Sequence, residues 1–78
     1  MQTLDTVSEG EIVRVIKVMG GMRIAQRLLE WGLVPDALVQ VVFNNKHGPI
    51  IIKANDATIA IGRGTAKKIL VEKVSMNG

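Results

Sequence analysis

The stretch Arg27-Leu28-Leu29-Glu30-Trp31-Gly32-Leu33-Val34-Pro35 decides how this chain folds. It combines the last turn of a helix, a stop signal and the start of a strand within nine residues. Apolar side chains at Ile24, Leu28 and Trp31 follow the i, i+4, i+7 spacing of one helix face. The spacing predicts a single α-helix over residues 22–31.

The predicted helix ends at a structural turn made by Gly32 and Pro35. Gly32 lies where a helix C-terminus needs a left-handed residue, and Pro35 prevents the helix from resuming. A helix of this length is marginal in water, because isolated helices shorter than about 12–15 residues rarely persist. We therefore expect it to pack on the rest of the chain, which has the pattern of a β protein.

Strands are indicated by β-branched residues between turn formers. Asn55 and Asp56 suit a two-residue hairpin turn, and one helical turn is expected near residues 65–68, capped by Thr65. The pattern predicts a mainly β fold, a small SH3-like, partly open β-barrel of about five strands with one inserted helix. We expect one domain over residues 1–78, with a frayed tail at 75–78. The predicted strands cover residues 12–18, 38–43, 50–54, 58–61 and 69–74.

Composition narrows the function classes. The 78 residues contain no cysteine, so disulfides and thiolate metal sites are excluded, and a reducing cytoplasm fits. The N-terminus lacks the pattern of a signal peptide, and no apolar run approaches the ~20 residues that cross a bilayer. Hydrophobic residues nevertheless make up 47% of this small chain, so we expect part of them in an exposed apolar patch.

The charge is uneven along the chain. Residues 37–78 carry six Lys or Arg against two acids, which permits an anionic partner. With one Trp, one Phe and no Tyr, however, the chain lacks the aromatic platforms that bind single-stranded nucleic acid or proline-rich peptides. Six basic residues spread over that length are also too few for the dense positive surface that binds double-stranded nucleic acid. Nucleic acid is therefore an unlikely partner.

Catalytic and metal-binding patterns are weak. His47 is the only histidine, and no serine stands in a nucleophile motif. The Gly62-Arg63-Gly64-Thr65 stretch superficially suits an anion but lacks P-loop spacing, and turn formation explains it more simply. Asn44, Asn45 and His47 offer at most a weak metal site. We predict no catalytic residue, no metal ligand, no cofactor and no small-molecule substrate.

A protein-interaction surface is the remaining prediction. The helix region carries more large apolar residues than one buried stripe needs, and Trp and Arg are enriched at binding hot spots. The alternative is that Trp31 plugs the barrel end with Leu29 packed beside it. A second alternative places the partner on the basic face around Lys53, Lys67 and Lys68. The predicted interface consists of Met22, Arg23, Arg27, Leu29 and Trp31.

The order of these elements resembles the FeoA family of small bacterial and archaeal proteins. The resemblance rests on Arg27-Leu28-x-x-x-Gly32-Leu33-x-Pro35, followed by Gly48-Pro49-x-x-Ile52 and Ile59-Ala60-Ile61-Gly62, and covers about residues 4–74. Asp36 stands where the family usually has Gly, and Asp tolerates a left-handed turn better than most residues.

The resemblance implies a non-enzymatic cytoplasmic accessory of ferrous-iron transport. Its implied partner is the cytoplasmic part of the membrane transporter FeoB, which brings the chain close to the membrane. Metal binding is then weak or indirect, and weak self-association is compatible with the resemblance. The alternatives are a regulatory domain of metalloregulator type and a small basic nucleic-acid-binding β-barrel.

Overall fold

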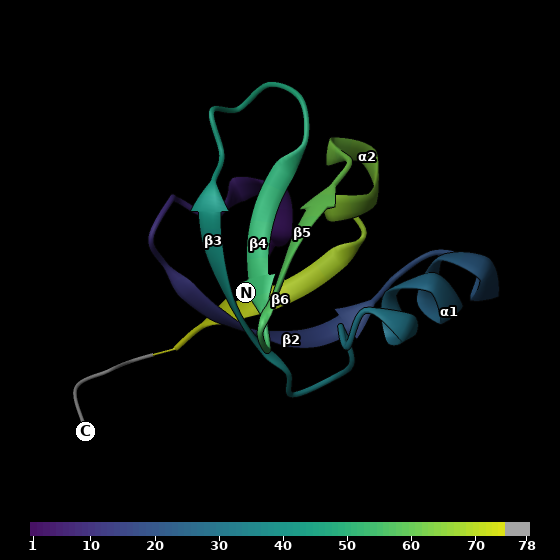
Figure 1. The fold of residues 1–78 in the computed structure, drawn as a ribbon. Coiled ribbons are helices and arrows are strands. Elements are labelled where there is room, and N and C mark those ends of the chain that lie inside the picture. Colours follow the sequence, from purple (N-terminus) through teal and green to yellow (C-terminus); the bar gives the residue numbers. More distant parts are fainter. Residues whose placement is uncertain (75–78) are drawn as a thin grey trace.

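The computed structural model describes residues 1–74, which form one curved antiparallel sheet with two helices (Figure 1). The sheet order is β1-β6-β2-β3-β4-β5, so β1 and β5 are edge strands and the sheet does not close. Helix α1 projects to one side of the sheet in Figure 1. The elements are β1 (Gln2–Thr3), a 3-10 turn η1 (Leu4–Thr6), β2 (Ile12–Val18), α1 (Met22–Glu30), β3 (Leu38–Phe43), β4 (Ile50–Ala54), β5 (Ala57–Ile61), α2 (Arg63–Ala66) and β6 (Ile69–Lys73).

The predicted fold class is confirmed, with three corrections of detail. A sixth strand, β1, pairs with β6, and its two residues are too few to show a strand pattern. Helix α1 ends at Glu30, with Trp31 as its C-cap. The short helix is predicted near residues 65–68 with Thr65 as its cap, but α2 covers Arg63–Ala66, because Gly62 is the N-cap and its carbonyl accepts the Ala66 N–H at 2.9 Å. The predicted frayed tail at 75–78 lies outside the described residues.

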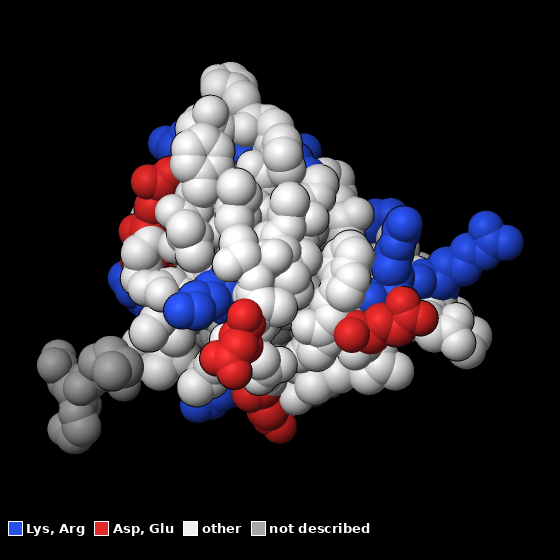
Figure 2. Space-filling model, viewed as in Figure 1, with Lys and Arg blue, Asp and Glu red and all other residues white. Residues whose placement is uncertain are grey.

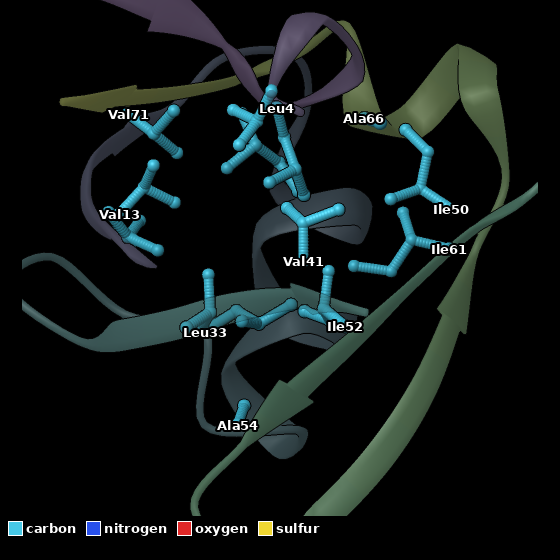
Figure 3. Packing of buried hydrophobic residues seen from close by; sticks show 14 of the residues in the cluster. Leu4, Val13, Leu33, Val41, Ile50, Ile52, Ala54, Ile61, Ala66 and Val71 are labelled. Atoms are coloured by element: carbon cyan, nitrogen blue, oxygen red, sulfur yellow. The ribbon is translucent and has the colours of Figure 1, made fainter. Parts of the chain in front are cut away.

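The core lies on the concave side of the sheet and is filled by apolar side chains alone (Figure 3). Strand residues alternate between core and surface, as a sheet with one buried face requires. In β2, for example, Val13 and Val15 are buried between more exposed neighbours. No polar or charged residue among residues 1–74 is buried. The hydrophobic effect of these side chains therefore supplies the main driving force for folding.

The end of α1 joins the helix to the sheet. Gly32 has φ +82°, and the N–H groups of Gly32 and Leu33 donate to the carbonyls of Leu29 and Leu28, both at 2.9 Å. These two bonds make a Schellman motif, in which Leu28 and Leu33 are the expected apolar pair, and both are buried. Asp36 then takes φ +75° and donates its N–H to the Val15 carbonyl at 2.7 Å.

Helix length sets a limit on membrane insertion. Within residues 1–74, neither helix is long and apolar enough to span a bilayer.

Candidate functional site

An apolar groove of about 450 Å³ lies between α1 and β2, and we call it the α1–β2 groove. Only Lys17 and Gln26 among its lining residues are polar. Ligand and peptide sites are usually concave and apolar with a few polar groups, and the groove has this character. It is lined by Ile16, Lys17, Val18, Met22, Ala25, Gln26, Leu29, Leu33, Val34 and Pro35.

The groove exists because α1 is apolar over a wider arc than the core covers. Successive helix residues are rotated by about 100°, so Ile24 and Leu28 share one face and Met22 and Leu29 share the next. Leu28 is 1% exposed, whereas Leu29 is 58% and Met22 is 86% exposed. The first face packs on the sheet, and the second forms one wall of the groove. The exposed apolar patch expected from composition is therefore present here.

The structure divides the five predicted interface residues among different surfaces of α1. Met22 and Leu29 line the α1–β2 groove. Arg27 and Trp31 line a smaller hollow of about 250 Å³, which lies between α1 and the end of β5. Arg23 and Arg27 also border an outer hollow with Gln26 and Glu30. No single hollow therefore contains all five residues, and the groove contains only two of them.

The alternative arrangement of the helix end is not what the structure shows. Trp31 is 38% exposed, so it is not a buried plug of the barrel end. Leu29 is 58% exposed and lines the α1–β2 groove, whereas Trp31 lines the other hollow.

Charged side chains gather over α1 in Figure 2, while most of the face over β3, β4 and β5 is uncharged. Two ion pairs occur within residues 1–74, Arg14 with Glu72 at 3.1 Å and Lys73 with Glu11 at 2.9 Å. The hydrogen bond from Lys73 holds the pKa of the Glu11 carboxyl below its usual value, and the Lys73 charge and the Ser8 N–H act in the same direction. The positively charged side chains of α1 take no part in these pairs.

Arg63 has a structural role that the sequence pattern did not reveal. Its guanidinium donates to the Gly48 carbonyl at 3.1 Å, the Asp5 carbonyl at 3.3 Å and the Asn44 Oδ1 at 2.8 Å. The Asn44 amide in turn donates to the carbonyls of Asp5 and Val7. Together the two side chains tie η1, the β3–β4 loop and α2 to one another. The Gly62-Arg63-Gly64 context hinted at a special position, but spacing along the chain could not identify these partners.

Polar side chains of the β3–β4 loop form hydrogen bonds within the loop and to Arg63. The Asn45 Oδ1 accepts the His47 N–H at 3.0 Å, and the Asn44 Oδ1 accepts both the Lys46 N–H and Arg63. His47 itself is exposed. Within the described part of the chain, no group of three or more His, Cys, Asp or Glu residues converges as metal ligands would.

The fold and the groove define a small antiparallel-sheet domain of the SH3-like kind. The FeoA domain model matches residues 2–73, and the chain belongs to the FeoA domain family. A protein of Methanocaldococcus jannaschii named "Putative Fe(2+) transport protein A" is 40% identical over 78 residues, which is 100% of this chain and 94% of the relative.

Two solved structures extend the comparison. The crystal structure of an iron uptake regulatory protein (FeoA) matches with a TM-score of 0.87 at 35% identity, over 92% of this chain and 96% of that chain. A manganese-dependent transcriptional repressor matches with a TM-score of 0.85 over 94% of this chain and 41% of its own. At 19% identity, the repressor shares the fold alone.

Proposed function

We propose that this protein is a non-enzymatic cytoplasmic accessory of ferrous-iron transport that binds the cytoplasmic part of the membrane transporter FeoB. The α1–β2 groove is the proposed binding surface, which refines the interface predicted from the sequence to the part that contains Met22 and Leu29.

The observation that carries the proposal is an apolar groove left open on a member of an iron-transport family. Met22 is 86% and Leu29 is 58% exposed, so most of the apolar surface of these two side chains stays in contact with water and contributes little to folding. Contiguous exposed apolar surface marks interaction sites in small soluble proteins, and Met adapts well to a partner's surface. The "Fe(2+) transport" in the relative's name supplies the process in which such a partner acts.

The partner's docking site can be tested by calorimetric titration of the chain with the cytoplasmic part of FeoB from the same organism. We expect Leu29→Ala to weaken binding on the order of tenfold, because a central apolar anchor contributes more than about 1 kcal/mol. Leu38→Ala is the matched control, since Leu38 is 53% exposed on β3 and is not part of the groove lining, and Leu29 is 58% exposed.

The outcomes separate clearly. Loss of affinity in Leu29→Ala with unchanged affinity in Leu38→Ala supports the groove as the site. Equal affinities for the parent and Leu29→Ala would move the binding surface elsewhere on the chain. A parent chain that does not bind the FeoB part at all would contradict the proposed function.

A further inference from the structure

One wall of the α1–β2 groove is a strand edge with no neighbouring strand. The pairing of β2 with β3 covers Ile12 to Arg14, and the next residue, Val15, donates to the Ala37 carbonyl at 2.8 Å. Pairing of β2 with β6 continues further, to Val18 opposite Ile69. Ile16 lies at a β-bulge and has no partner in β6, whereas Lys17 and Val18 pair with Leu70 and Ile69. Among residues 1–74, no strand lies on the other side of residues 16–18.

The lining of the groove shows that it runs along this edge. Side chains of a regular strand alternate between the two faces of the sheet, but the β-bulge between Val15 and Lys17 interrupts that alternation in β2. At this bulge the groove contacts Ile16, Lys17 and Val18 in succession. The opposite wall of the groove contains Val34 and Pro35. These residues precede β3 and do not pair with residues 16–18.

The charges around the groove favour an acidic ligand. Lys17 is the only charged residue in the lining, and it is in neither of the two ion pairs of the described residues. The neighbouring outer face of α1 carries Arg23 and Arg27 against Glu30. Asp36 follows Pro35 in the chain but is not part of the lining. A bound segment with a carboxylate near Lys17 thus gains a favourable contact, and a basic segment is disfavoured.

We infer that the groove binds an extended acidic–apolar segment of the partner, which adds as a short strand to the free edge of residues 16–18. The backbone groups of that segment complete the hydrogen bonding of β2, as in other cases of strand addition. Its apolar side chains pack against Met22, Ala25 and Leu29, and one carboxylate lies against Lys17. The inference rests on the proposed function, from which it takes the cytoplasmic part of FeoB as the partner.

The backbone part of the inference is tested by amide hydrogen exchange, measured by NMR on the full chain with and without the FeoB cytoplasmic part. We expect at least one amide within residues 16–18 to exchange on the order of tenfold more slowly in the complex, because an added strand protects the amides with which it pairs. The exchange rates of the amides of β5, the five-residue edge strand of the sheet, serve as the internal control and should be unchanged. Binding that leaves all amides of residues 16–18 unprotected overturns the inference while the proposed function stands.

The charge part is tested by Lys17→Glu, Lys17→Arg and the control Lys53→Glu, which makes the same charge change on an exposed residue of β4. We expect Lys17→Glu to weaken binding on the order of tenfold at low salt, Lys17→Arg to bind within about threefold of the parent, and Lys53→Glu to bind like the parent. Equal losses in Lys17→Glu and Lys53→Glu would show a general charge effect and overturn the carboxylate contact. If the parent does not bind the FeoB part, both the proposed function and this inference fail.

Discussion

Leu28 and Leu29 are neighbours in the same helix, yet they belong to different parts of the molecule. Leu28 is 1% exposed and belongs to the core beneath the sheet, whereas Leu29 is 58% exposed and lines the groove. The sheet side of the molecule is filled, because five of its strands contribute buried side chains to one apolar core (Figure 3). In contrast, the nine residues of α1 bury Leu28 alone.

The core side and the groove side of α1 therefore have different roles: the core side contributes to stability, and the groove side is available for binding. Core side chains are closely packed, so removing one leaves a cavity that the surrounding side chains fill only in part. The groove side of α1 has apolar side chains that contribute little to packing within the chain. A change in the core should therefore lower stability, and a change in the groove should alter binding with stability retained.

The largest effect is expected from Leu28→Ala, which should lower the free energy of unfolding by about 2–5 kcal/mol through lost burial and a cavity. Leu29→Ala, one residue further on, should change it by no more than about 0.5 kcal/mol. Urea unfolding followed by circular dichroism measures both. Similar losses for the two variants would remove the distinction between the core and the groove sides of α1.

The next effect concerns the join between the two regions. Gly32→Val places a β-branched residue at φ +82° and a Cβ 2.9 Å from the Asn55 Nδ2, so we expect a loss of about 1–3 kcal/mol. Gly64→Ala is the control, because that position has no close neighbour for a Cβ and lies in a helix. Thermal melts of the two variants measure the difference. An unchanged Tm for Gly32→Val would contradict the Schellman end of α1.

Arg63→Lys tests the polar ties between η1, the β3–β4 loop and α2. The lysine keeps the charge but cannot reach three acceptors with a planar fork, so we expect a loss of about 1–3 kcal/mol. Arg14→Lys at the half-exposed pair with Glu72 should cost less than about 1 kcal/mol. Binding to the FeoB part should be unaffected by either change. If Arg63→Lys is as stable as the parent, the network does not hold the loop and α2 in place.

The smallest effect is expected from Glu11→Gln, and it depends on pH. The pKa of Glu11 is lowered in the folded state, so the folded chain holds this carboxylate's proton less well than the unfolded chain does. The stabilisation is thus present at neutral pH and is lost as the pH falls through the folded-state pKa. Melts at pH 7 should show a slightly lower Tm for Glu11→Gln, and melts near pH 2 should show none. The same small difference at both values would mean that the ion pair with Lys73 is not its cause.

The parts of the structure that could be predicted from the sequence depend on local patterns. Alternating or continuous β-branched runs located β2, β3 and β4 at their observed bounds, because their pattern and flanking turn formers lie within a few residues. The helix and its end at Gly32 could be predicted for the same reason, because their signals also lie within a few residues of each other. The positive φ of Asp36, +75°, agrees with the tolerance of Asp for left-handed backbone.

The parts that escaped prediction depend on residues far apart in the chain. Arg63 bonds to Asp5 across 58 residues, and β1 is a strand only because β6 lies beside it. The groove likewise needs β2 to extend past β3 while α1 stands opposite, and no spacing within either element reveals that. For this reason the sequence indicated the helix as an interface but could not separate Leu29 from Trp31 or bring Lys17 to the same site.

We propose that the partner contacts the groove side of α1, and not the core or the outer sheet face. The most direct measurement is a methyl NMR titration of the full chain, labelled at leucine, with the cytoplasmic part of FeoB. We expect the methyl signals of Leu29 to shift or broaden with the titration, while those of Leu38 on β3 stay in place. Shifts at Leu38 with Leu29 unchanged would place the binding surface on β3 and rule out the groove.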